Sequence, residues 1–135
     1  MPKPPMIADV QWDRDLVFHA ESNGRTMTMD GDSKAGPSPV QALAFALAGC
    51  MSTDVAFVLA RGRHTIRAMR AHFVGERAQD DPHRFVRMNL RFTVEGDVPA
   101  DAVERAIALS RDTYCSVWHS MRQDIDFTVS FELIA

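Results

Sequence analysis

Two cysteines, Cys50 and Cys115, are the side chains of this sequence best suited to covalent chemistry. Cys50 lies in the middle of a long apolar stretch, where a thiol is by base rate a small core side chain. Cys115 stands at the expected start of a short helix, where backbone N–H groups and the helix dipole lower the pKa of a thiol. The chain has no CxxC motif and no histidine cluster, so we expect no structural zinc, no other metal and no cofactor. A reactive thiol pair remains the alternative to two core side chains.

His119 follows Cys115 by four residues and would share its helix face. It could stabilise a thiolate there, or it could be a half-exposed imidazole with no chemical role. A Cys–His hydrolase is a sharper alternative, but the sequence offers no third residue that would orient the imidazole. The sequence therefore leaves His119 as a supporting candidate only.

Two further charged residues lie near candidate positions. Asp54 is one helical turn beyond Cys50, where we expect it to cap a backbone group or to pair with an arginine. Arg14 lies in a turn between two aspartates, and this position alone indicates a solvated surface charge.

The stretch Ser38 to Arg61 is the element that must position Cys50. Ser38 suits an N-cap and Pro39 the first helical position, while Gly62 suits a left-handed C-terminal cap. The residues between are apolar on all sides, which predicts a helix buried on all sides. The uncharged run ends at Asp54 after about half the roughly 20 residues that a membrane span needs, so we predict a core helix and no membrane partner.

Strands are predicted on both sides of this helix by alternating apolar and polar residues. The expected strands are residues 6–12, 16–20, 25–29, 66–77, 86–94 and 125–133. Asn23-Gly24 predicts a hairpin turn between the second and third strands. A helix opens at Pro99, and a shorter one over residues 114–122 is expected to be capped by Thr113 or Asp112.

This order predicts an α+β fold of type βββαββααβ, with one mostly antiparallel six-stranded sheet. We expect a single domain over residues 1–135, with a mobile tail at residues 1–5. A net charge of −3 gives no electrostatic footprint for nucleic acid, and the absence of an apolar signal segment predicts a cytoplasmic location. One sheet covers only one face of an apolar helix, so a second copy of the chain is the expected cover for the other face.

Four segments resemble the OsmC/Ohr family of hydroperoxide-reducing proteins over nearly the whole chain. They are GPSPVQALAFALAGC, GER, FTVEGDVPADAVERAIALS and YCSV. The paired features are specific: one cysteine inside the long helix and a second about 65 residues later at a helix start. The pattern is most similar to the OsmC-like branch and less similar to the organic hydroperoxide resistance proteins.

The resemblance implies an OsmC-like fold and an intertwined homodimer, with the two long helices at its centre and two active sites at the subunit interface. It implies that Cys50 is the peroxidatic thiol, that Cys115 is the resolving thiol, and that the protein is an organic hydroperoxide reductase active in oxidative stress defence. An apolar site suits an alkyl or lipid hydroperoxide. The reductant would be a dithiol, which in the resistance branch is a dihydrolipoyl protein.

The chain departs from the family pattern where the long helix begins. The family has Asn-Pro-Glu-Glu or Asn-Pro-Glu-Gln there, and this chain has Ser38-Pro39-Val40-Gln41. Val40 replaces the glutamate that holds a catalytic arginine, which leaves Gln41 as the polar neighbour. Arg14, followed by an aspartate as in the resistance proteins, is the matching cation, and Lys34 is the alternative. The departure predicts slower peroxide turnover than in relatives that carry the glutamate.

Three functions are compatible with these residues. The first is the thiol peroxidase just described. The second is a binding or sensor protein that takes a small apolar or thiol-reactive ligand in the interface cleft without efficient turnover. The third is an enzyme acting on another thiol electrophile or transferring sulfur.

Overall fold

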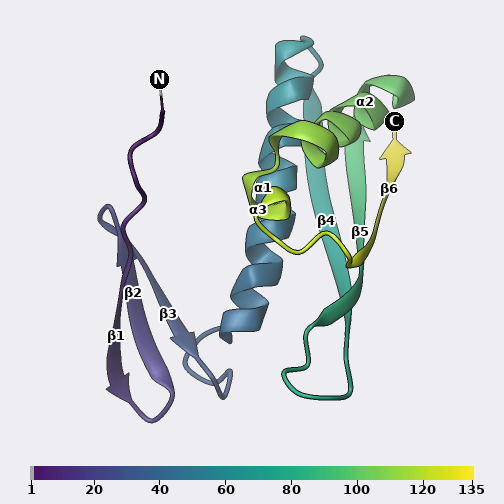
Figure 1. The fold of residues 1–135 in the computed structure, drawn as a ribbon. Coiled ribbons are helices and arrows are strands. Elements are labelled where there is room, and N and C mark those ends of the chain that lie inside the picture. The colour runs from purple at the N-terminus through teal and green to yellow at the C-terminus, as the bar shows by residue number, and fades with distance from the viewer. Residues whose placement is uncertain (1) are drawn as a thin grey trace. The chain divides into compact units, whose positions relative to one another are not determined.

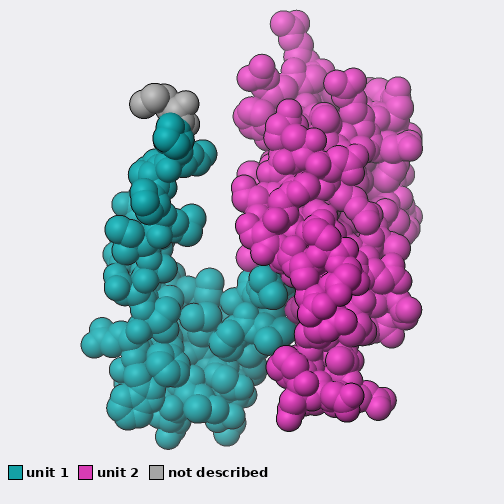
Figure 2. All heavy atoms as spheres, viewed as in Figure 1, with its two compact units in different colours: residues 1–45 teal, residues 46–135 magenta. Residues whose placement is uncertain are grey.

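The computed structural model describes residues 2–135, which form two compact units, Met1–Phe45 and Ala46–Ala135 (Figure 2). Their helices and strands follow one another along the chain as drawn in Figure 1. The bounds are β1 Asp9–Arg14, β2 Val17–Ser22, β3 Arg25–Asp30, α1 Pro39–Arg61, β4 Ile66–Arg77, β5 Phe85–Gly96, α2 Ala100–Leu109, the π-helical turn η1 Ser110–Tyr114, α3 Ser116–His119 and β6 Asp126–Ile134. The order of elements is the predicted one, with η1 inserted after α2.

The first unit carries a three-stranded antiparallel sheet in the order β1-β2-β3. Asn23 and Gly24 form the predicted turn between β2 and β3, and both take positive φ, of 50° and 77°. A two-residue turn with two positive φ angles matches the twist of a hairpin, which explains the Asn-Gly pair. Every residue of β1 is exposed, so this small sheet has little core of its own.

The second unit carries the other sheet, in the order β4-β5-β6. β4 and β5 are antiparallel, whereas β5 and β6 are parallel. The expectation of one six-stranded sheet within the chain is therefore wrong: the six strands fall into two sheets of three. The parallel pair is possible because β5 and β6 are joined through helices, and parallel neighbours need such a crossover connection.

The predicted alternation on β5 is confirmed and defines the core. β5 is the central strand of its sheet, and its inward side chains Met88, Leu90, Phe92 and Val94 are fully buried. The helices of this unit pack over that face of the sheet (Figure 1). The intervening Arg87, Asn89 and Arg91 are exposed, so the opposite face meets solvent.

Within one chain, helix α1 is buried along one stripe only, and the expected burial of its other side by a second copy stays a prediction. The buried residues follow a spacing of four and are Leu47, Met51, Val55 and Leu59. Phe57, on the same helix, is 62% exposed. Among the described residues α1 alone has the length and apolar character of a membrane span, with a mean hydropathy of 1.9, a property that core helices share. Its buried stripe packs into the core of the second unit.

The start of α1 is a reciprocal cap. Ser38 Oγ accepts a hydrogen bond from the Gln41 backbone N–H at 3.1 Å, and Gln41 Oε1 accepts one from the Ser38 N–H at 2.9 Å. This is the capping-box arrangement, and it confirms Ser38 as the N-cap. Ser33 Oγ also donates to Gln41 Oε1, at 3.1 Å. The Gln41 side chain therefore helps to cap α1 and to hold the preceding loop.

The end of α1 differs from expectation by one residue. Arg63, with φ of 63°, takes the left-handed conformation that we expected at Gly62. His64 N–H donates to the Leu59 carbonyl at 2.9 Å and Arg63 N–H to the Ala60 carbonyl at 3.0 Å. These two bonds form a Schellman motif, which places the left-handed residue one position later than the glycine.

The predicted helix over residues 114–122 is also shorter than expected. α3 covers only Ser116–His119, and Cys115 itself is its N-cap in place of Thr113 or Asp112. The preceding turn η1 is π-helical, with the Cys115 N–H donating to the Ser110 carbonyl five residues back, at 2.8 Å. A thiol can cap a helix because sulfur accepts a weak hydrogen bond.

The reciprocal cap gives a stability prediction. Ser38→Ala removes the acceptor for the Gln41 N–H and should lower the free energy of unfolding by about 1 kcal/mol, whereas Ser38→Asp should retain it. Urea denaturation at one fixed protein concentration measures the difference. Ser120→Ala, at an exposed position, is the matched control. Equal losses for Ser38→Ala and Ser120→Ala would show that the cap contributes nothing specific.

Candidate functional site

Cys50, Asp54 and Cys115 form one cluster in the second unit. Their two Sγ atoms and a carboxylate oxygen all lie within 4.8 Å of one another. Cys115 is fully buried, while Cys50 and Asp54 are half-buried. The two cysteines are not joined by a disulfide in this structure. Residues 65 positions apart are thus brought together, as a reactive thiol pair requires.

Helix α1 positions the first half of the cluster. Cys50 and Asp54 are four residues apart and therefore lie one above the other on one helix face. The neighbouring buried residues Met51 and Val55 anchor this turn of the helix in the core. The rotation of α1 about its axis is thereby fixed, and with it the direction of both functional side chains.

The turn after α2 positions Cys115. The π-helical turn ends at Cys115, whose Sγ accepts a hydrogen bond from the Trp118 backbone N–H at 3.3 Å. The Trp118 ring packs on Phe127 of β6, with ring centroids 4.7 Å apart. Such single wide turns occur frequently at functional sites, because they re-aim side chains at the end of a helix.

Arg111 fastens the same turn to β6. Its guanidinium donates to the Phe127 carbonyl at 2.6 Å and lies over the Phe127 ring, 5.1 Å from the centroid. The His119 Nε2 hydrogen-bonds to the Arg111 carbonyl at 2.9 Å. The His119 ring therefore helps to hold the turn in place, and its support of a Cys115 thiolate stays a prediction.

Asp54 has a partner that the sequence did not indicate. Ser110 Oγ donates a hydrogen bond to Asp54 Oδ2 at 2.7 Å, which corrects the expected pairing with an arginine. Ser110 is fully buried, on the stripe of α2 and η1 that faces the core. A serine on an otherwise apolar stripe must find a buried polar partner, and that was the one sequence signal for this contact. Nothing in the sequence singled out Trp118.

Burial dominates the acidity of Cys115. It raises the pKa of this thiol from an ordinary 9.0 to about 11, with the Trp118 N–H acting in the opposite direction and the neighbouring Cys50 raising it further. The backbone N–H groups at the helix start, those of Val117 and Trp118, do lower this pKa as expected, but burial outweighs them and the net shift is upward. A four-residue helix does not offset the loss of water around the sulfur.

The remaining predicted site residues lie in the first unit. The Arg14 guanidinium pairs with the Asp13 carboxylate at 2.7 Å, and that carboxylate also contacts His19 Nε2 at 2.8 Å. Lys34 donates its backbone N–H to Asp30 Oδ2 at 3.2 Å. Gln41 caps α1. Their role toward the thiols stays a prediction.

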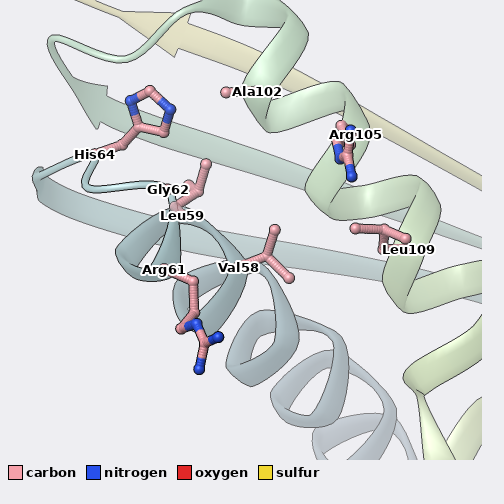
Figure 3. Close-up of a pocket in the computed structure, with 8 residues that line it drawn as sticks. All are labelled: Val58, Leu59, Arg61, Gly62, His64, Ala102, Arg105 and Leu109. Atoms are coloured by element: carbon pink, nitrogen blue, oxygen red, sulfur yellow. The ribbon is translucent and has the colours of Figure 1, made fainter.

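Two apolar pockets open beside α1 in the second unit. One, of about 500 Å³, is lined by Asp54, Phe57, Val58, Arg61, Leu109 and Tyr114, so it reaches the carboxylate of the cluster. The other, of about 420 Å³, lies between the end of α1 and α2, with Arg61, His64 and Arg105 at its rim (Figure 3). Only the first shares a residue with the thiol cluster.

Residues 30–130 match the family described as OsmC-like protein. The chain belongs to this OsmC-like family. Protein YhfA of Escherichia coli K12 is 36% identical over 133 residues, which are 96% of this chain and 99% of that protein. The family resemblance inferred from the sequence is thus confirmed.

Solved structures of OsmC-like proteins share the fold. A crystal structure of an OsmC-like protein from Mycoplasma pneumoniae is 16% identical, with a TM-score of 0.86 over 99% of this chain and 100% of that chain. An organic hydroperoxide resistance protein OsmC from Legionella pneumophila is 16% identical, with a TM-score of 0.70 over 98% of this chain and 99% of that one. At these identities the likeness concerns the α+β fold.

The buried thiol of this OsmC-like protein gives a pH prediction. Because the pKa of Cys115 is raised on folding, the folded state keeps this proton to higher pH than the unfolded chain does. Its contribution to stability is fully present below about pH 9 and is lost as the pH rises toward 11. Urea denaturation of the reduced protein across this range should show a steeper loss than in Cys115→Ala.

Cys50→Ala is the matched control for this measurement. It should keep most of the pH dependence, since burial is the largest cause of the shift. Parallel pH profiles for the reduced protein and Cys115→Ala would contradict the assignment.

Proposed function

We propose that this protein is a thiol-dependent peroxidase that reduces organic hydroperoxides through Cys50 and Cys115. The observation that carries the proposal is the approach of the two Sγ atoms to within 4.8 Å. A disulfide needs about 2.05 Å between sulfurs, so a small side-chain movement would join them. Family membership supports the same chemistry, because relatives of this fold include an organic hydroperoxide resistance protein.

The exposures of the two thiols support the proposed order in which they react. Cys50 is half-buried and reachable, whereas Cys115 is fully buried. In the proposed reaction the Cys50 thiolate attacks one oxygen of ROOH, the O–O bond breaks, and the alkoxide takes a proton and leaves as ROH. Cys50 becomes a sulfenic acid. Cys115 then attacks the sulfenic sulfur, its proton and the hydroxyl leave as water, and a disulfide forms.

The oxidised pair must be returned to two thiols. An external dithiol attacks the disulfide, becomes oxidised itself, and leaves Cys50 and Cys115 reduced. We propose a dihydrolipoyl protein as this donor, following the family resemblance, and a cytoplasmic location in keeping with reduced thiols.

The cation that would stabilise the Cys50 thiolate is proposed to be Arg14, with Lys34 as the alternative. Arg14 lies in the first unit, where its guanidinium pairs with the Asp13 carboxylate. Val40 has no carboxylate that could hold the Arg14 guanidinium near the Cys50 thiol. Charge-assisted hydrogen bonds are about twice as strong as neutral ones, so this absence supports slower turnover than in relatives with the glutamate.

A second candidate function rests on the pocket beside the cluster. Its walls are Phe57, Val58, Leu109 and Tyr114, with Asp54 and Arg61 as polar groups, and its volume of about 500 Å³ suits a small ligand. A ligand held there would lie beside the thiols without being turned over. Consumption of peroxide separates this sensor function from the peroxidase.

We also propose that the protein works as an intertwined homodimer. Strand β1 of the first unit is exposed along its whole length, with Trp12 62% exposed, and isolated three-stranded sheets need a covered apolar face. On α1, the large apolar side chains Leu43, Phe45 and Phe57 lie outside the buried stripe. A large apolar interface between two copies would bury these groups.

The peroxidase proposal predicts distinct phenotypes for the two thiols. Purified protein with a dithiol should reduce cumene hydroperoxide over many turnovers. Cys50→Ser should abolish turnover. Cys115→Ser should consume about one equivalent and then stop, because the sulfenic acid lacks its resolving partner. Mass spectrometry of the product should show one intramolecular disulfide in the parent protein.

A control variant with both thiols intact completes that experiment. Ser116→Ala, beside Cys115 and exposed, should leave turnover unchanged. Full dithiol-dependent turnover by Cys115→Ser would contradict the resolving role, and peroxide binding without consumption by the parent protein would favour the sensor function.

The dimer proposal predicts a mass of twice the 15.1 kDa chain in light scattering at micromolar concentration. Phe57→Lys places a charge on the exposed apolar face of α1 and should shift the protein toward monomer. Val74→Lys, at a comparably exposed apolar residue on β4, should not. A stable monomer of the parent protein at micromolar concentration would defeat the proposal.

A further inference from the structure

The cluster formed by Cys50, Asp54 and Cys115 has the composition of a metal site as well as of a redox pair. Its three donor atoms converge within 4.8 Å of one another. A tetrahedral Zn²⁺ with bonds of about 2.0 to 2.3 Å holds its donors about 3.3 to 3.8 Å apart. Each donor would therefore need to move by about 1 Å or less to reach a common ion.

We propose that the reduced cluster is a binding site for one thiophilic divalent cation, of which Zn²⁺ is the natural example. Two thiolates and one carboxylate are donors that Zn²⁺ and Cd²⁺ accept, whereas Mg²⁺ and Ca²⁺ prefer oxygen alone. On binding, both thiols release their protons to solvent. The site depends on the thiols being reduced and not on any peroxidase activity.

Contacts around the cluster hold two of the three donors in direction. Ser110 Oγ donates to Asp54 Oδ2 at 2.7 Å, which leaves the other carboxylate oxygen for an ion. The Trp118 N–H donates to the Cys115 sulfur at 3.3 Å, and thiolate ligands retain such bonds. Outer-shell groups of this kind orient ligands in known metal sites. Ser110 is fully buried, so its hydrogen bond is shielded from water.

The half-buried side of the cluster leaves a fourth position open. Asp54 lines the pocket of about 500 Å³, so water or a small ligand can reach an ion bound to its carboxylate. Three protein ligands and one exchangeable position make a site of the open type, not the closed type of structural zinc. Binding should accordingly be reversible and removable by a chelator.

The test uses chelator-treated, fully reduced protein without peroxide. Dialysis against Zn²⁺ should give one ion per chain, and Co²⁺ in its place should give thiolate-to-metal charge-transfer bands with the strong visible absorption of a tetrahedral site. Asp54→Asn, which keeps both thiols, should weaken Zn²⁺ binding more than about 10-fold, and Ser110→Ala about 10-fold. Asp80→Asn, an exposed aspartate in the β4–β5 turn, should bind as the parent does.

A second measurement uses the unmodified chain, so its result does not depend on whether the variants fold. Zn²⁺ should slow alkylation of Cys50 by iodoacetamide in the unmodified chain, and protein alkylated at Cys50 should lose the cobalt charge-transfer bands. The proposal is overturned if the reduced protein takes up no stoichiometric metal, if Asp54→Asn binds Zn²⁺ as tightly as the parent, or if the alkylated protein still binds.

Discussion

The packing of one narrow stripe of α1 against the sheet of β4, β5 and β6 is the constraint on which the site depends. Leu47, Met51, Val55 and Leu59 lock the helix at one rotation over the buried face of β5. That rotation alone directs Cys50 and Asp54 toward the turn that carries Cys115. A helix turned by a third of a revolution would direct Cys50 and Asp54 away from Cys115.

The same burial has two opposing effects on the chemistry of the thiols. Bringing Cys115 into the core places it beside Cys50 but raises its pKa, since a thiolate loses its hydration there. The Trp118 N–H donates a hydrogen bond to the Cys115 sulfur, which acts against this rise. Val40, at the start of α1, offers no carboxylate that could position a cation. The reduced pair, the proposed disulfide and the proposed metal-bound pair would be mutually exclusive states of the same two sulfurs. The compartment's redox state and metal supply would select among them.

The rest of α1 and the first unit present a different kind of problem. Apolar side chains on the exposed side of the helix, and a three-stranded sheet with little core, leave much surface unpartnered. Among residues 2–135 no further helix or strand covers them. The proposed homodimer would give both elements a core and would place a substrate close to the apolar side chains of two copies.

The sequence by itself determined the elements that depend on local pattern. These include the alternation on β5, the Asn23-Gly24 turn and the Ser38 cap. Tertiary structure decided what depends on distant residues: the division into two sheets, the parallel β6, the Ser110–Asp54 bond and the recruitment of His119 to Arg111. Alternation says which face of a strand is buried but not which strand lies beside it. Likewise, the acidity of Cys115 follows from how deeply the completed core buries it, which no local pattern encodes.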